Sequence, residues 1–157
     1  MDLLKLRVFE DSDIALVKTW LRKAYILKWY EDPDSWLVEM YGRFDEYSFI
    51  NHFIALCGDT PIGFCQYYNC ADAGEEWYGD IPVTGSYSID YLIGEEPYLG
   101  RGLGKAIIGL LVEEIFSLEG ARRIIVSPEA ENTPSCKSLL ANGFAFDERN
   151  KLYCRIK

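Results

Sequence analysis

Residues 98–105 read Y-L-G-R-G-L-G-K, so three glycines stand directly before an apolar pattern of helical period. Glycine tolerates positive φ and lets the backbone approach a ligand closely, and the first N–H groups of a helix have no partner within it. A glycine turn followed by a helix start therefore suits a phosphate group. The segment predicts a pyrophosphate site, and an ordinary tight turn is the alternative interpretation.

Two familiar phosphate-binding motifs do not fit this segment. A P-loop continues from Gly-Lys to Ser or Thr, whereas Ala106 follows Gly104 and Lys105 here. A dinucleotide fingerprint follows the first strand of a repeated βαβ unit, whereas these glycines come after about two-thirds of the chain. The motif therefore indicates neither a P-loop NTPase nor a Rossmann-type enzyme.

A second candidate for chemistry is Asp90, within the strand-like run S-Y-S-I-D-Y-L-I at residues 86–93. Strand alternation puts Ser88, Asp90 and Leu92 on one face. A carboxylate in an otherwise apolar run is costly unless it is paired or used. Asp90 is therefore either a functional carboxylate or a buried acid satisfied by backbone groups or by Tyr and Ser hydroxyls.

Acidic and aromatic residues are mixed in two stretches, residues 29–47 and 72–80. The first stretch includes Trp29, Tyr30, Trp36, Glu39, Tyr41, Phe44 and Tyr47, and the second includes Asp72, Glu75, Glu76, Trp77, Tyr78 and Asp80. Carboxylates beside aromatic faces suit ammonium groups, although core aromatics with a solvated acidic face would give the same pattern. The formal net charge of −9 agrees with a cationic ligand and argues against nucleic acid or an anionic membrane as partner.

Composition indicates neither a metal site nor a secreted protein. The five cysteines are scattered without close pairs, and the single histidine, His52, lies in a strand-like run, which favours a structural role. The N-terminus alternates and is charged, unlike a signal peptide, and no apolar run approaches about 18 residues. We therefore expect a cytoplasmic protein with no bound metal and no membrane partner.

The elements that must position these residues follow an ordered α/β plan. Helices are expected at residues 11–23, 33–46, 102–118 and from Thr133 to about 142, and strands at residues 3–9, 49–57, 62–69, 86–93, 122–126, 144–147 and 151–156. A polar, glycine-containing loop spans residues 71–85. With no repeat and no plausible linker, residues 1–157 are expected to form one domain.

The order of these elements and motifs resembles the GNAT N-acetyltransferase superfamily, which uses acetyl-CoA. Residues 99–104 match the two glycine positions of its loop pattern Q/R-x-x-G-x-G/A, with Leu99 at the first position, and residues 132–144 read N-T-P-S-C-K-S-L-L-A-N-G-F. The resemblance implies an α+β fold with a mixed, mostly antiparallel central sheet flanked by helices. The residues it assigns to acetyl-CoA are Leu92, Ile93, Leu99, Gly100, Arg101, Gly102, Leu103, Gly104, Lys105 and Asn132.

Within that superfamily, several segments from Trp20 onward look like the aminoglycoside 6′-N-acetyltransferases. The resemblance implies that Asp90 receives the proton of a cationic small-molecule amine. It also implies a substrate pocket formed by Gln66, Trp77 and Tyr78, and Trp29 and Tyr30 of the first aromatic stretch are expected to join it. Acetyl transfer would be direct, with a backbone N–H near Ile93 stabilising the oxyanion.

Two departures from the family keep alternatives open. Leu139 replaces the Tyr that serves many members as general acid to the thiolate. Either Ser138, Cys136 or a water substitutes for it, or the thiolate leaves unassisted, so no acid is assigned. Ser127 stands where the aminoglycoside enzymes often have Asp. An N-terminal acetyltransferase of the ribosomal-protein type and a non-catalytic acyl-CoA-binding module are therefore the alternatives, and the protein is expected to be a monomer or a homodimer.

Overall fold

The computed structural model describes residues 3–157, and within that range seven strands form one sheet in the order β1-β2-β3-β4-β5-β7-β6. The strands are β1 (Leu4–Val8), β2 (Ile50–Cys57), β3 (Thr60–Asn69), β4 (Ser86–Ile93), β5 (Arg123–Val126), β6 (Ala145–Asp147) and β7 (Leu152–Ile156). All neighbours are antiparallel except β4 and β5, which run parallel. The expected mostly antiparallel, mixed sheet is confirmed.

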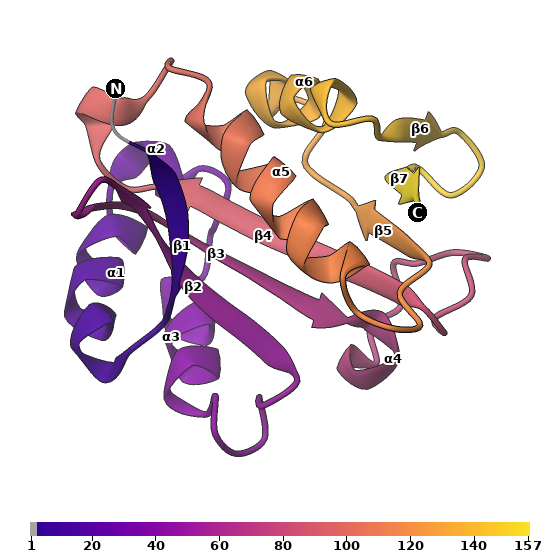
Figure 1. Ribbon diagram of the computed structural model, residues 1–157, viewed down its shortest axis with the longest axis horizontal. Coiled ribbons are helices and arrows are strands. Elements are labelled where there is room, and N and C mark those ends of the chain that lie inside the picture. Colours follow the sequence, from indigo (N-terminus) through magenta and orange to yellow (C-terminus); the bar gives the residue numbers. More distant parts are fainter. Residues whose placement is uncertain (1–2) are drawn as a thin grey trace.

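Helices cover both faces of this sheet. They are α1 (Ile14–Leu21), α2 (Ala24–Leu27), α3 (Pro33–Tyr41), α4 (Cys70–Ala73), α5 (Leu103–Phe116) and α6 (Thr133–Ala141), with 3₁₀ turns at Asp11–Asp13 and Glu96–Tyr98. Helix α3 lies behind β2 in Figure 1, whereas α5 crosses in front of β4. Helix α1 shares the core of α3, on the face away from α5. The sheet therefore has two buried faces.

Strand β4 contributes to both faces by alternation. Ile89 and Tyr91 pack into the core around α5, whereas Leu92 packs into the core that Trp20 of α1 builds on the other side. Asp90, between Ile89 and Tyr91, therefore faces the α3 side of the sheet. This agrees with the face predicted from the alternating sequence.

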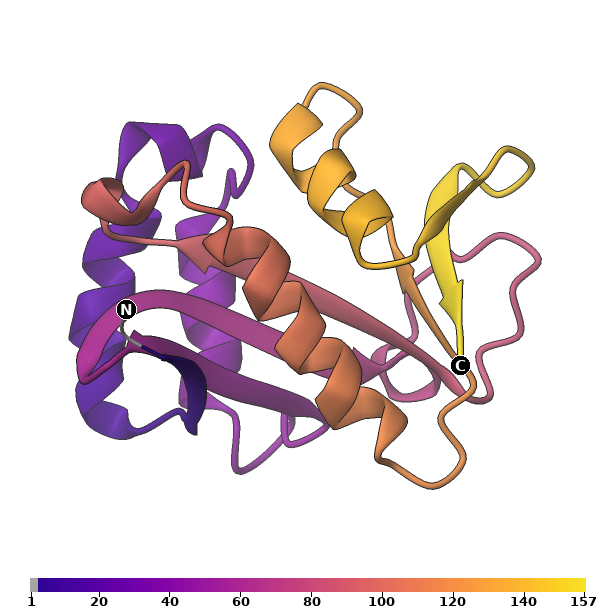
Figure 2. The same ribbon diagram turned by 45° about the horizontal axis from the view of Figure 1, so that its top comes forward.

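The sheet opens beside β4. Strands β4 and β5 pair only at Ser86 with Arg123 and at Tyr87 with Ile124, although β4 continues to Ile93. Figure 2 shows α6, β5, β6 and β7, in orange to yellow, splayed away from α5. The second half of β4 therefore presents one edge that no neighbouring strand covers.

The predicted helix over residues 33–46 is too long, because α3 ends at Tyr41. Gly42 lies against the ring of Tyr47, where an added Cβ would come within 2.8 Å of Cδ2. The N–H of Tyr47 donates to the carbonyl of Gly42, so the chain turns there. Helices α2 and α4 were not predicted, since four residues are too few to show a helical period.

Candidate active site

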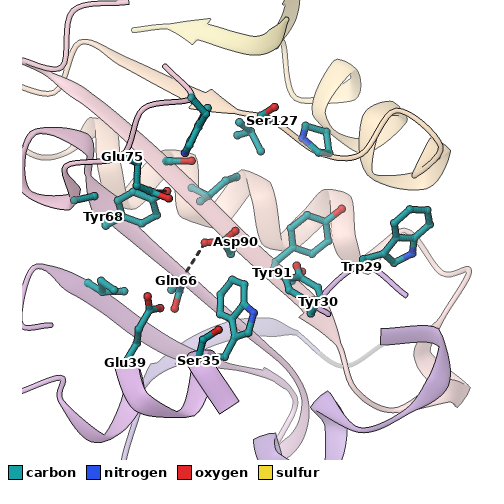
Figure 3. A pocket seen from close by; sticks show the side chains of 18 of the residues that line it. Trp29, Tyr30, Ser35, Glu39, Gln66, Tyr68, Glu75, Asp90, Tyr91 and Ser127 are labelled. Carbon is teal, nitrogen blue, oxygen red and sulfur yellow. Dashed lines mark hydrogen bonds between the residues drawn. The ribbon is translucent and has the colours of Figure 1, made fainter. Parts of the chain in front are cut away.

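A cavity of about 610 Å³ lies beside the uncovered half of β4, between α3, the loop after α4 and the start of α6. Figure 3 shows its lining side chains. Its polar and aromatic members include Trp29, Tyr30, Trp36, Glu39, Gln66, Tyr68, Glu75, Trp77, Asp90, Tyr91, Ser127, Asn132 and Ser135. Side chains from distant parts of the sequence therefore meet at one site.

Asp90 is at the centre of the cavity and is paired with Gln66 of the adjacent strand β3. The Nε2 of Gln66 donates to Oδ2 of Asp90 at 3.0 Å, and the two residues are direct partners in the β3–β4 register. Burial raises the pKa of Asp90 to about 6, with a further rise from the charge of Glu75, while the Gln66 bond opposes the change. A carboxylate with this pKa accepts a proton more readily near neutral pH than an exposed Asp does.

Glu75 is the second acid of the cavity, and two tyrosines hold it. The hydroxyls of Tyr68 and Tyr78 both donate to Oε1 of Glu75, at 2.9 and 3.3 Å. Tyr78 is only 4% exposed and does not line the cavity, whereas its neighbour Trp77 does. Of the predicted Trp77–Tyr78 pair, the structure thus brings Trp77 to the cavity and leaves Tyr78 beneath it, against Glu75.

Glu39 is the third acid of the cavity and comes from the opposite side, from α3. Burial, followed by the charges of Asp90 and Glu75, raises the pKa of Glu39 to about 7. Trp36, three residues earlier, faces the same cavity. The i, i+3 spacing of Trp36 and Glu39 was the sequence signal for a shared helix face, but neither residue was selected as a site residue.

The raised pKa of Glu39 predicts a pH-dependent effect of Glu39→Gln on stability. Between the ordinary value of 4.5 and about 7, the folded protein keeps a proton on Glu39 that the unfolded chain loses. The free energy of unfolding of the wild type therefore falls as pH rises through this range. Glutamine does not titrate, so the variant does not lose stability in this way. The melting temperature of Glu39→Gln relative to the wild type should increase between about pH 5 and pH 8.

Thermal melts across this pH range, with Glu46→Gln as matched control, check the expectation. Glu46 lies in the same acidic stretch but is exposed and outside the cavity lining. A difference between wild type and Glu39→Gln that stays constant with pH would contradict the assignment of a raised pKa to Glu39.

The glycine-rich loop adopts the conformation its sequence predicts. Gly100 and Gly102 have φ of 74° and 75°, and Gly102 is the N-cap of α5. The first helical bond runs from the N–H of Ala106 to the carbonyl of Gly102, and within residues 3–157 no backbone acceptor is found for the N–H groups of residues 100–105. These N–H groups are available to an anion at the positive end of α5.

The side chains of the loop contribute less than its backbone. Leu99 is 44% exposed, Arg101 is exposed with its guanidinium carbon 5.2 Å from the ring centroid of Tyr98, and Lys105 is exposed. The ring of Tyr91 packs where a side chain at Gly104 would lie. The cradle is therefore built mainly from backbone, and Lys105 can add charge to it.

The uncovered edge of β4 presents backbone groups next to the cavity. Tyr25 donates its hydroxyl to the carbonyl of Ile93 at 2.9 Å, and Tyr30 donates to the carbonyl of Tyr91. The N–H and C=O of one strand residue point to the same side, so the N–H groups of Tyr91 and Ile93 also face this edge. The side chain of Leu92 is instead buried in the α1 core.

The remaining predicted residues line the cavity from two sides, the segment before α3 and the start of α6. Trp29 and Tyr30 line the cavity, as does Asn132, the N-cap of α6, whose Oδ1 accepts from the N–H of Ser135 at 3.4 Å. Ser127 also lines the cavity, without a charge. Leu139 is 1% exposed and packs in the α5 core, so α6 offers no general acid to the cavity from that position.

The geometry combines a helix-start anion cradle, an open strand edge and a paired carboxylate, which suit a phosphorylated ligand bound beside a proton acceptor. The family model described as "Acetyltransferase (GNAT) domain" matches residues 10–152. The chain belongs to the GNAT acetyltransferase family. It is therefore an acyltransferase whose acetyl donor is acetyl-CoA, and the helix-start cradle and strand edge fit the pyrophosphate and the amide-containing arm of that donor.

Two curated relatives have a similar sequence over most of the chain. The chain is 26% identical over 149 residues to an aminoglycoside N(6′)-acetyltransferase type 1 of Klebsiella pneumoniae, and equally similar to one of Serratia marcescens. Both alignments cover 91% of this GNAT chain and 74% of the relative.

Solved structures share the fold. The aminoglycoside acetyltransferase AAC(6′)-Ib with coenzyme A has a TM-score of 0.84 at 22% identity, covering 99% of this chain and 95% of that one. An aminoglycoside N(6′)-acetyltransferase of Legionella pneumophila has a TM-score of 0.76 at 16% identity, covering 99% and 93%. These similarities place the chain in the GNAT fold.

Residues 3–157 contain no helix that is both long and apolar enough to span a membrane. Over the same range, the described His, Cys, Asp and Glu side chains form no group with the arrangement of a metal site. The five cysteines, all within this range, are unpaired thiols, and burial raises the pKa of Cys65 and Cys70.

Proposed function

We propose that the chain transfers the acetyl group of acetyl-CoA to a primary amine of an aminoglycoside. The observation that carries the proposal is the convergence of Glu39, Glu75 and Asp90 on one aromatic cavity beside the β4 edge. The exposed Glu129 also lines the cavity, and four carboxylates around a partly desolvated cavity favour a ligand with several ammonium groups. Relatives that are named for acting on aminoglycosides support the same substrate class.

The proposed reaction is a direct transfer within a ternary complex. A neutral amine attacks the thioester carbon, its proton passes to Asp90 directly or through a water, and the oxyanion is stabilised by the N–H of Ile93 at the β4 edge. The carboxyls of Glu39 and Glu75 hold the other ammonium groups, so the amine is positioned before attack. Gln66 keeps the carboxyl of Asp90 oriented.

The test is thiol release from acetyl-CoA with a panel of aminoglycosides, polyamines and peptides with basic N-termini, followed by mass spectrometry of each product. We expect aminoglycosides to give the highest kcat/KM and to gain one acetyl group on an amine. Turnover of peptides alone would contradict the proposed substrate and favour the ribosomal-protein type of N-terminal acetyltransferase. Acetyl-CoA binding without turnover of any amine would favour an acyl-CoA-binding module.

A further inference from the structure

The loop that brings Glu75 and Trp77 to the cavity has few backbone contacts of its own. It connects α4 to β4, and Gly74 and Gly79, with φ of 66° and 63°, stand at the two ends of the segment that carries both residues. Within residues 3–157, no backbone acceptor is found for the N–H groups of residues 75–79. The position of this segment therefore depends on contacts from elsewhere in the fold.

Asn150, in the turn between β6 and β7, makes such a contact. Its Oδ1 accepts a hydrogen bond from the N–H of Asp80 at 2.8 Å, directly after Gly79. An added Cβ at Gly79 would overlap that oxygen, so the glycine lets the loop backbone approach the amide. Figure 2 shows the loop after α4 beside the β6–β7 arm. The amide of Asn150 thus joins two loops that are distant in the sequence.

The β6–β7 turn holds the amide of Asn150 in one orientation. The backbone N–H and the Nδ2 of Asn150 donate to Oδ1 and Oδ2 of Asp147, at 3.0 and 2.9 Å. These two bonds hold the pKa of Asp147 below its usual value, so its carboxylate stays ionised as their acceptor. The N–H of Lys151 donates to the carbonyl of Asp147 at 2.8 Å and closes the turn. Oδ1 of Asn150 is therefore presented to Asp80 by a fixed support.

The contact at Asp80 reaches the cavity through Tyr78. Tyr78 belongs to the same buried cluster as Leu152 of β7, and its hydroxyl donates to Glu75. The ring of Trp77 packs edge-on against the ring of Tyr78, with 4.7 Å between the centroids. A displacement of the backbone at Asp80 would therefore move both cavity residues of the loop.

We propose that Asn150 is a positioning residue for the acceptor amine, because it holds the loop backbone at Asp80 and so fixes Glu75 and Trp77 at the cavity wall. The inference rests on the proposed function, in which Glu75 binds an ammonium group of the acceptor. Arg149 and Asp80 also form an ion pair between the two loops, at 2.7 Å, but both side chains are largely exposed. An exposed pair of this kind contributes little, so the amide of Asn150 is the polar contact that matters.

The experiment compares the kinetics of Asn150→Ala with those of Arg149→Ala, its matched control in the same turn. Asn150→Ala should raise KM for the acceptor by about 10-fold, while kcat and the dissociation constant of acetyl-CoA change by no more than about twofold. The reason is that a remote binding contact is lost and the reacting groups at β4 keep their places. Arg149→Ala should retain the wild-type KM. Parallel losses of kcat and of acetyl-CoA affinity in Asn150→Ala would show a merely structural role and overturn the proposal.

A second variant and a coupled substitution make the test specific. Gly79→Ala pushes the same amide away and should raise KM as Asn150→Ala does, whereas Gly120→Ala controls for backbone strain, since its φ is 86° and nothing lies near its added Cβ. In a Glu75→Gln background, Asn150→Ala should raise KM by no more than about threefold, because the charge that it positions is absent. An undiminished effect in that background would contradict the proposal.

Hydrogen exchange tests the contact without any acceptor. The N–H of Asp80 should exchange at least about 10-fold faster in Asn150→Ala than in the wild type. Unchanged exchange, or faster exchange with a wild-type KM, would overturn the inference. The kinetic assay uses the most active amine of the panel, and the dissociation constant of a linear polyamine replaces KM if no amine is turned over. A wrong acceptor class is then evident in the wild type, whereas a failure of this inference is evident in the ratio of variant to wild type.

Discussion

Replacing Asp90 with asparagine should lower kcat/KM for the acceptor amine by about 1,000-fold, equivalent to about 4 kcal/mol of transition-state stabilisation. Asparagine keeps the size of the side chain, and its carbonyl oxygen can still accept the hydrogen bond from Nε2 of Gln66. It cannot take the proton of the amine or attract its charge. The expected loss therefore reports the carboxylate itself and not a change in packing.

The pH profile separates this role from a general weakening of the site. Asp90 must be ionised to accept a proton, and its pKa is raised to about 6, so wild-type activity should rise as the pH increases through that value. Asp90→Asn should lack this limb while binding acetyl-CoA with unchanged affinity in a calorimetric titration. Asp72→Asn, an exposed change outside the cavity lining, is the control. Wild-type turnover by Asp90→Asn would show that another group removes the proton.

The parts of the site that were predictable from sequence are those encoded locally. Alternation in residues 86–93 put Asp90 and Leu92 on one face of the strand, and the glycines before an apolar helical period predicted the anion cradle at the start of α5. Both patterns depend on short-range geometry, namely the period of two in a strand and the free N–H groups of a helix start.

The acidic character of the cavity was predictable only in part. Glu39 and Asp90 are 51 positions apart and line one cavity because α3 shares a core with Phe64 of β3 and Leu92 of β4, a tertiary arrangement that no local pattern encodes. The aromatic pair at Trp77 and Tyr78 illustrates the same limit, since adjacent residues in a loop take different directions. Trp77 faces the cavity, while Tyr78 is buried and supports Glu75 from below.

The surroundings of Tyr91 were not predictable from the sequence either. Tyr91 and Ser135 are 44 positions apart, and the sequence offers no indication that the phenol of Tyr91 in β4 reaches Ser135 of α6. In the sequence, Tyr91 is one more aromatic residue of an alternating strand. Only the separation of β5 from β4 after Tyr87 exposes the space into which its hydroxyl projects.

Gly104→Val should raise the dissociation constant of acetyl-CoA by about 100-fold, equivalent to about 2.7 kcal/mol. Gly104 is in the first turn of α5, where an added Cβ would already lie 3.1 Å from the ring of Tyr91. The two further methyl groups of valine would occupy the space through which a pyrophosphate approaches the N–H groups of the turn. Valine costs less than about 1 kcal/mol in helix propensity, so the variant should still fold.

Gly109→Ala in the same helix provides the matched control for this change. Its Cβ would meet only Oδ1 of Asn142, at 3.3 Å, and replacing a mid-helix glycine should add up to about 1 kcal/mol of stability. Calorimetric titration with acetyl-CoA and thermal melts of both variants measure the two effects separately. Wild-type affinity in Gly104→Val would mean that the pyrophosphate does not bind at the start of α5. Weak binding confined to Gly104→Val, with both proteins folded, would assign the cradle to the backbone of that first turn.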